Sequence, residues 1–218
     1  MQALKIKILL FSIMFVLLPL FLAQAQPLYP ETVSGLKMVF MKESRAQKSY
    51  MAFSEKAKAE NYPNIARLFV AIATSESIHA RNMKKILSDL GVEVKDPQNM
   101  ETKILDTKIN LGTALDRELQ DIDQIYPGIL EKMKIEGNES AIKALTFTWE
   151  SEKQHRQIIQ TIRSATESDI LFGMVAGTIE NSSSRSYICT ICGSTVMELP
   201  KETCPICNNP VSNYKDGP

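Results

Sequence analysis

The chain contains two histidines, and both lie in the same short pattern, Ser-Glu-x-x-His. An offset of 76 residues, from 79 to 155, superimposes the two copies. The same offset aligns other residues of like character: Glu60 with Glu136 and Phe69 with Leu145. A repeat of this kind is typical of a duplicated supersecondary unit. A Glu and a His three residues apart project from one face of an α-helix, so we expect a duplicated helix pair with one Glu–His face on each copy.

The stretch around both copies has the pattern of four helices. Residues 31–165 contain few glycines, and their apolar residues recur at three- and four-residue steps. Pro63 can begin the second helix at its first position, and Asn138 can cap the fourth. Pro127 falls inside the third helix and should loosen it, because its ring displaces a backbone hydrogen bond. We predict an all-α fold, with a four-helix bundle over residues 26–172.

The two Glu–His pairs indicate a two-metal site. The first and third helices each offer one glutamate in matching register with the pairs. One glutamate from each of two helices, with a Glu-x-x-His pair from each of the other two, is the ligand pattern of ferritin-like di-iron proteins. Carboxylate and imidazole ligands suit iron or manganese. The predicted ligands are Glu43, Glu76, His79, Glu118, Glu152 and His155.

Three further residues are candidates for the same site. Asp121 lies one turn after Glu118, in the segment DRELQDID, whose other acids a solvated helix face also explains. Tyr50 and Tyr126 follow the ligand positions of the first and third helices. We expect both tyrosines beside the metals as candidate catalytic residues, although a tyrosine is also ordinary core material in a bundle.

The four cysteines all lie near the C-terminus, in two Cys-x-x-Cys pairs. Two such pairs can turn four thiolates toward one centre, which is typical of a zinc or single-iron site. Two disulfides are the alternative, because the chain has the features of an exported protein. We predict a small metal domain over residues 187–218 and a linker over residues 173–186, GMVAGTIENSSSRS. The predicted thiolate ligands are Cys189, Cys192, Cys204 and Cys207.

The N-terminus has the features of a signal peptide over residues 1–25. Lys5 and Lys7 precede an apolar run, and AQAQ offers a cleavage site ending at Ala25. The run is short for a membrane span, so we expect cleavage, export to a periplasm and no membrane attachment afterwards. An uncleaved N-terminal anchor is the alternative. The formal net charge of +0 gives no support for nucleic-acid binding.

In combination, these motifs resemble those of the rubrerythrins. The resemblance rests on ESRAQKSY, SESIH, REL, IYP and SEKQH, followed by the two Cys-x-x-Cys pairs, and it spans residues 31–214. It implies a ferritin-like bundle with two non-haem irons and a small C-terminal rubredoxin-like domain with one iron, or alternatively zinc, on four cysteines. It also implies reductive removal of hydrogen peroxide, with electrons passing through the rubredoxin-like site from an unidentified donor. We further expect a homodimer.

The sequence departs from the family pattern in three places. Asp121 stands where many members have a glutamate that exchanges with a histidine on one iron. Asn208 stands where the family usually has a glycine after the last cysteine, so we expect a left-handed turn there at some cost. The signal peptide is the third departure, because the better-known members are cytosolic.

Two other functions compete with a peroxidase. A ferritin-like iron oxidase or store would use the same bundle without needing a thiolate relay. A binding module would use the bundle as a scaffold and the cysteine tail as a structural zinc ribbon. The metal content of the purified protein separates the three hypotheses.

Overall fold

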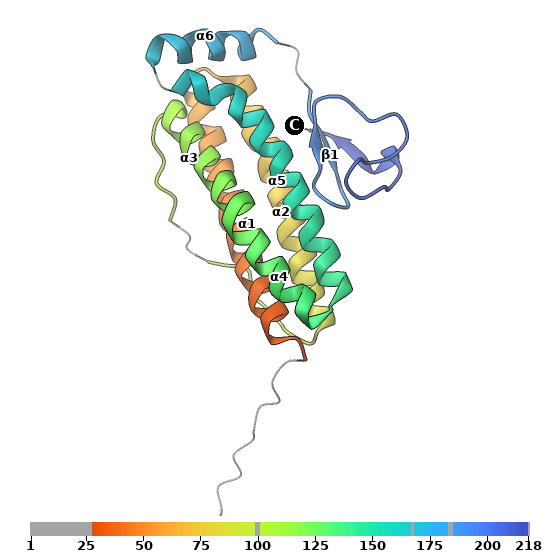
Figure 1. The fold of residues 1–218 in the computed structure, drawn as a ribbon. Helices are drawn as coiled ribbons and strands as arrows, with labels where there is room; N and C mark the ends of the chain where they lie inside the picture. The colour runs from red at the N-terminus through yellow and green to blue at the C-terminus, as the bar shows by residue number, and fades with distance from the viewer. Residues whose placement is uncertain (1–27, 99–100, 167, 183–184, 218) are drawn as a thin grey trace, which may run out of the picture.

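The computed structural model describes residues 28–98, 101–166, 168–182 and 185–217. The predicted signal peptide lies outside these residues. The described chain is a long helical bundle with a small β domain on its side (Figure 1). The bundle elements are α1 (Pro30–Ala59), α2 (Pro63–Asp89), α3 (Thr107–Gln120), the π-helical turn η1 (Asp121–Ile125), α4 (Tyr126–Glu136) and α5 (Glu139–Thr166). The predicted all-α bundle is confirmed.

Local sequence signals set the helix ends. Pro30 and Pro63 begin α1 and α2, where the backbone N–H that proline lacks would have no partner. Asp106 caps α3 through a 2.8 Å hydrogen bond from the Ile109 amide. Asn138 accepts a 3.0 Å hydrogen bond from the amide of Ala141 in the first turn of α5. The predicted roles of Pro63 and Asn138 are therefore confirmed.

The predicted third helix is divided by a wider turn. Pro127 lies in the first turn of α4, directly after η1. At the junction the amide of Tyr126 donates to the carbonyl of Asp121, five residues earlier, as in a π-helix. This matches the expectation that Pro127 loosens the helix. The distortion falls just after Glu118, next to a predicted metal ligand, which is a common place for π-helical turns.

Two glutamates that the repeat aligns cap helices in the opposite half of the bundle. Glu60, at the end of α1, accepts hydrogen bonds from the amide and hydroxyl of Thr107 at the start of α3, at 2.8 and 2.7 Å. Glu136, at the end of α4, accepts from the amides of Glu31 and Thr32 at the start of α1, both at 2.8 Å. A carboxylate is favourable at both places because helix N-termini carry partial positive charge.

The core is divided into two apolar clusters with a polar layer between them. One cluster includes Phe53, Phe69 and Leu115. The other includes Val39, Met83, Leu130 and Leu145. The six predicted carboxylate and histidine ligands lie on α1, α2, α3 and α5 between the two clusters, and all six are nearly fully buried. A fully buried layer of this charge indicates a bound cation, because unpaired buried charges are costly.

The predicted linker is wrong over its first part. Residues 173–186 begin inside a helix, α6 (Asp169–Glu180), which lies across one end of the bundle (Figure 1). Phe172 and Ala176 of α6 are buried in the first apolar cluster. The Glu180 carboxylate accepts from the amides of Asn64 and Ile65, at 2.7 and 3.0 Å, and so caps α2. These tertiary contacts outweigh the low helix propensity of the two glycines in this segment.

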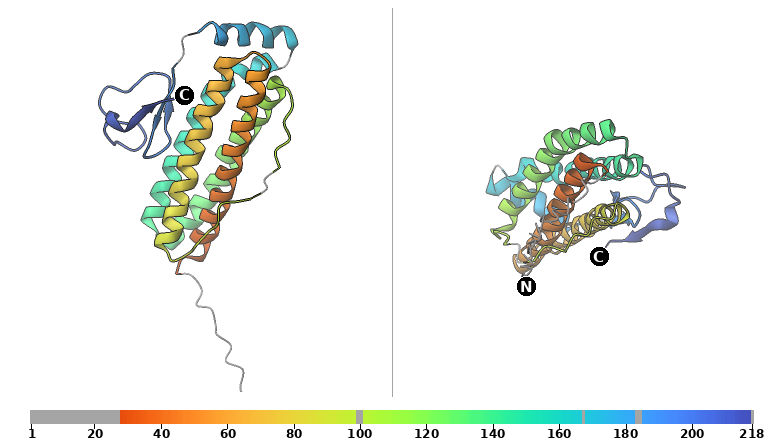
Figure 2. Two further views of the ribbon diagram at one scale, coloured as in Figure 1. Left: turned by 180° about the vertical axis from the view of Figure 1, so that it is seen from behind. Right: turned by 90° about the horizontal axis from the view of Figure 1, so that it is seen from below.

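The C-terminal residues 185–217, here called the four-cysteine domain, form a three-stranded antiparallel sheet in the order β2-β1-β3. The elements are β1 (Tyr187–Cys189), β2 (Thr195–Val196), the 3₁₀ turn η2 (Val211–Asn213) and β3 (Tyr214–Asp216). The domain packs against the side of the bundle formed by α2 and α5, as both views in Figure 2 show. Within the described residues, no helix is long and apolar enough to span a membrane.

Candidate metal centres

The structure brings all six predicted bundle ligands together. Their donor atoms form two overlapping groups of four, within 4.8 Å of one another in each group. One group contains Glu43 and His79, and the other contains Glu118 and His155. Glu76 and Glu152 belong to both groups, as bridging carboxylates would. Each half of the duplicated bundle thus contributes one half of a two-metal site, here called the carboxylate–histidine site.

Both histidines turn the same ring nitrogen toward the carboxylates. Nδ1 of His79 lies 2.9 Å from Glu76 and 3.0 Å from Glu152. Nδ1 of His155 lies 3.0 Å from Glu152 and 3.3 Å from Glu76. Nε2 of each ring instead faces the four-cysteine domain. Nδ1 is therefore the nitrogen placed to bind a metal ion.

The electrostatics favour protonation of the groups that would bind cations. Burial disfavours a charged imidazole, yet the carboxylates of Glu76 and Glu152 outweigh it and raise the pKa of His79 to about 9 and of His155 to about 10. Burial, then the charge of Glu152, raises the pKa of Glu43 and Glu118 well above the usual value. The raised pKa values favour proton binding in the metal-free site, and a metal ion would compete with those protons.

The donor set fits two divalent metal ions. Four carboxylates can balance the charge of two such ions, and one imidazole is available for each. Oε1 of Glu76 and Oε1 of Glu152 are buried without a hydrogen bond among the described residues, because the imidazole Nδ1 that each one faces, at 3.3 and 3.0 Å, already bonds to the other glutamate. Buried polar atoms are nearly always satisfied, so these oxygens are where additional cations are needed.

The two predicted tyrosines lie behind the ligands. Tyr50 donates a 2.7 Å hydrogen bond to Glu118, and Tyr126 donates to Glu43, and both rings are fully buried. Burial and the adjacent carboxylate raise the pKa of both phenols well above its usual value, so they remain donors at neutral pH. They act through the carboxylates that they orient, which makes them positioning residues.

Asp121 lies at the edge of the site rather than in either ligand group. It forms a 2.7 Å ion pair with Lys42, and burial raises the pKa of its carboxyl to about 6. Both residues line a cavity of about 380 Å³ that reaches all four site carboxylates. Arg117 also lines this cavity. Sequence reasoning missed Lys42 and Arg117, because nothing local distinguishes them from solvated helix charges.

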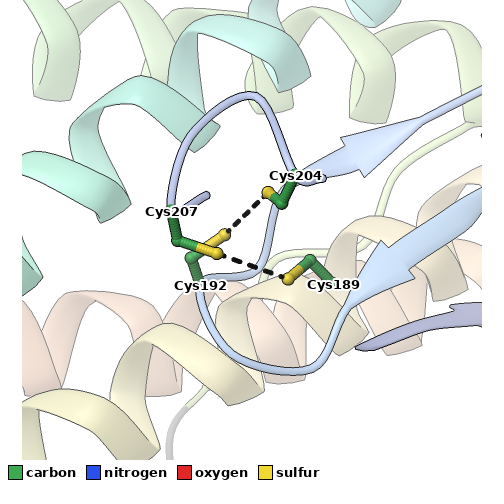
Figure 3. A group of neighbouring side chains, drawn as sticks. All are labelled: Cys189, Cys192, Cys204 and Cys207. Atoms are coloured by element: carbon green, nitrogen blue, oxygen red, sulfur yellow. Dashed lines mark hydrogen bonds between the residues drawn. The ribbon is translucent and has the colours of Figure 1, made fainter. Parts of the chain in front are cut away.

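The four cysteines form the second centre (Figure 3). Their thiols are free, with Sγ–Sγ distances of 3.6 Å between Cys192 and Cys204 and 3.8 Å between Cys189 and Cys207. A disulfide needs about 2.05 Å, whereas a tetrahedral site with metal–sulfur bonds of about 2.3 Å needs sulfur atoms about 3.8 Å apart. The arrangement fits one tetrahedral metal ion and not the alternative of two disulfides.

The two cysteine pairs have matching turns. The amide of Gly193 donates to the carbonyl of Cys189, and the amide of Asn208 donates to the carbonyl of Cys204, both at 2.9 Å. Gly193 and Asn208 both have positive φ, of 85° and 57°. The left-handed turn expected at Asn208 is therefore confirmed. The hydroxyl of Tyr214 donates to Cys204 Sγ at 3.3 Å, a contact that sequence reasoning missed.

The two centres meet at one loop of the four-cysteine domain. Ser75 donates a 2.6 Å hydrogen bond to the carbonyl of Gly193, the residue after Cys192. Gln154 accepts from the hydroxyl of Ser194 at 3.0 Å and from the amide of Thr195 at 3.1 Å. The thiolate site is thus held against the helices that carry the two histidines.

Comparison with known proteins decides the family. The sequence matches the family model for rubrerythrin over residues 35–162. Rubrerythrin-2 of Clostridium acetobutylicum is 37% identical, across 81% of this chain and 91% of its own length. The chain belongs to the rubrerythrin family. Rubrerythrins carry a di-iron site and a four-cysteine metal site, and the two clusters above have the residues for both.

Solved structures agree on the fold. The fully reduced, all-ferrous state of nigerythrin superposes with a TM-score of 0.73 and 24% identity, over 85% of this chain and 86% of nigerythrin. The bacterioferritin of Desulfovibrio desulfuricans, whose structure has a di-iron site, superposes with a TM-score of 0.63 and 20% identity, over 72% of this chain and 91% of its own. Family membership indicates an oxidoreductase.

Proposed function

We propose that this rubrerythrin-family chain reduces hydrogen peroxide to water at the carboxylate–histidine site, with electrons supplied through the four-cysteine domain. The observation that carries the proposal is the junction at Gly193, which holds a thiolate metal site against both histidine-bearing helices. A ferritin-like iron store would not need electrons from a thiolate site, so it would not need this junction. A zinc ribbon that served only to bind a partner would not need to pack on metal ligands.

The reaction consumes two electrons and two protons for each peroxide: H₂O₂ + 2 H⁺ + 2 e⁻ → 2 H₂O. Two ferrous ions bound by the six bundle ligands would supply one electron each, so that the O–O bond breaks without release of a hydroxyl radical. The four cysteines would hold a one-electron metal ion through which an external donor could replace these electrons one at a time. The reduction of peroxide at the bundle does not depend on which donor supplies these electrons.

The protein's own residues have distinct roles in this reaction. The cavity lined by Lys42 and Arg117 would admit a small polar oxidant to the carboxylates, and Lys42 is held at its edge by the 2.7 Å ion pair with Asp121. Tyr50 and Tyr126 keep Glu118 and Glu43 oriented. The two apolar clusters on either side exclude bulk water from the rest of the site.

Metal analysis with a peroxide titration tests the proposal. Residues 26–218 would be purified anaerobically, reduced and mixed with peroxide. We expect two bundle irons and one thiolate iron per chain, with rapid peroxide consumption that leaves both kinds of iron oxidised. Faster consumption of oxygen than of peroxide would favour an iron oxidase. Zinc on the cysteines with unreactive bundle iron would favour a binding module, and either result would overturn the proposal.

A further inference from the structure

The repeated Ser-Glu-x-x-His pattern contains a serine that ligand binding does not explain. Ser75 and Ser151 lie four residues before the two histidines, and both are fully buried. Their Oγ atoms are 3.5 Å apart, so they lie side by side beneath the four-cysteine domain. Ser75 also donates to the Gly193 carbonyl at 2.6 Å. Among the described residues, Ser151 makes no hydrogen bond to the four-cysteine domain.

The Gly193 carbonyl accepts hydrogen bonds from two hydroxyls, each of which lies beside one of the two histidines. It accepts from Ser75 of the bundle at 2.6 Å and from the Thr195 hydroxyl at 3.1 Å. Ser75 Oγ lies 3.4 Å from Nε2 of His79, and Thr195 Oγ1 lies 3.3 Å from Nε2 of His155. Each histidine is therefore linked by one hydroxyl to the same carbonyl of the thiolate loop.

The protonation of a metal-bound histidine makes these contacts directional. When Nδ1 binds a metal ion, Nε2 carries the proton and donates it to a neighbouring acceptor, which fixes the ring. A hydroxyl can accept that proton and still donate its own. Ser75 can therefore accept from His79 and donate to Gly193 at the same time, and Thr195 can do the same from His155.

The close approach of the two centres also depends on the absence of a side chain at position 193. A Cβ on Gly193 would collide with Nε2 of His79 and would lie 2.8 Å from Oγ of Ser75. The backbone of Gly193 is directly bonded to Cys192, which is a predicted thiolate ligand. The loop can therefore lie on the imidazole only while this position has no side chain and the carbonyl is held in place.

We propose that Ser75 is a positioning residue that couples the two centres by holding the Gly193 carbonyl against His79. The inference rests on the proposed function and assigns a role to one hydroxyl within it. Other contacts of the domain, from Arg81 to the Thr190 carbonyl and from Asn82 to the Ile191 carbonyl, lie at the exposed rim. Ser75 is the bundle residue that donates to the loop at the buried centre of the contact.

Ser75→Ala is the test variant, and Ser151→Ala is its matched control. Both remove one buried hydroxyl from the same pattern, but only the first removes the bond to Gly193.

Hydrogen exchange in the full-length protein loaded with diamagnetic zinc reports the contact directly. The Thr195 amide bonds across the contact to Gln154, whereas the Gly193 amide bonds inside the domain to Cys189. We expect Ser75→Ala to speed exchange at Thr195 about five-fold, the effect of losing one ordinary hydrogen bond, with Gly193 unchanged.

Rapid mixing of the iron-loaded, fully reduced variants with peroxide gives the functional readout. In each variant, oxidation of the bundle irons provides the internal reference rate, and we expect it to be unchanged in Ser151→Ala. Appearance of the ferric thiolate absorption should slow about five-fold or more in Ser75→Ala and remain unchanged in Ser151→Ala. The absorption spectrum and iron content of the thiolate site should be the same in both. Thr195→Val, which removes the second hydroxyl at nearly constant volume, should slow the same phase.

The outcomes separate this inference from the proposed function. If wild-type protein oxidises its bundle irons but never its thiolate iron, the proposed function fails. If wild-type protein shows both phases while Ser75→Ala and Ser151→Ala behave alike in exchange and in rate, the role of Ser75 is overturned and the function stands. A Ser75→Ala protein that loses iron from either site would show a structural role and would also overturn the inference.

Discussion

At the scale of single residues, the ligands could be predicted from the sequence and their neighbours could not. The Glu–His spacing and its duplication are local properties of two helices, and the structure brings those residues together. The bond between Ser75 and Gly193 joins residues 118 positions apart. It depends on how one domain packs on another, which periodicity does not encode. Lys42 is similar, because its pairing with Asp121 depends on how α1 packs beside η1.

Asp121 provides a prediction at this scale. Neither ligand group includes it, and its carboxylate is paired with Lys42 at 2.7 Å. We therefore expect Asp121→Ala to bind both bundle irons fully. Because partly exposed ion pairs contribute little, its rate with peroxide should stay within about five-fold of wild type. Iron analysis and stopped-flow mixing check this, with Glu118→Ala as the control that should lose iron. Loss of one iron from Asp121→Ala would show that Asp121 is a ligand.

At the scale of elements, the positions where helices begin were more predictable from the sequence than the tertiary contacts that stabilise them. Pro63 and Asn138 act through their own backbone and side chain, so their positions were evident. Helix α6 was missed because its glycines disfavour a helix, while the contacts that stabilise it come from the bundle. The cross-capping by Glu60 and Glu136 was also hidden, although the repeat had aligned the two residues.

The cap at Glu60 can be tested by its removal. Glu60→Ala deletes the acceptor for the first turn of α3, so we expect a loss of about 1 kcal/mol in the free energy of unfolding. Hydrogen bonds from Thr107 and Lys56 outweigh the effect of burial and hold the pKa of Glu60 below its usual value. Because the folded pKa is depressed, this contribution is present above the unfolded pKa and lost as pH falls through the folded one.

Denaturant titrations at pH 7 provide the measurement. Glu55→Ala is the matched control, since Glu55 is an exposed glutamate one turn earlier on the same helix. The control should stay within about 0.5 kcal/mol of wild type. Equal stability of the two variants would show that Glu60 is not a cap in solution.

At the scale of the whole molecule, the carboxylate–histidine site couples folding to metal binding. Without metal, the folded protein raises the pKa of His79 to about 9 and of His155 to about 10. A raised folded pKa gives stability that is complete below the unfolded value of about 6.5 and is lost as pH rises through the folded value. We expect the metal-free protein to lose on the order of a few kcal/mol of stability between about pH 6.5 and 10.

Thermal unfolding of the metal-free and iron-loaded proteins across this pH range tests the coupling. The iron-loaded protein should show no such loss in this window, because its imidazoles are already deprotonated by the metal. Addition of metal at pH 7 should release protons, which a pH indicator in weak buffer can record. A metal-free protein whose melting temperature is constant or rises from about pH 6.5 to 9.5 would contradict the assignment of the site.

Loss of one cysteine ligand tests directly whether the four-cysteine domain supplies electrons to the bundle. Cys204→Ser leaves three thiolates, so it should impair the thiolate iron while the six bundle ligands remain intact. Single-turnover and steady-state peroxide consumption would be measured on the same preparation, with a donor that reduces the thiolate site. We predict that the chemically reduced variant consumes peroxide once at a near wild-type rate, whereas its steady-state turnover falls to background. Equal losses in the two assays, or full steady-state turnover, would contradict the relay.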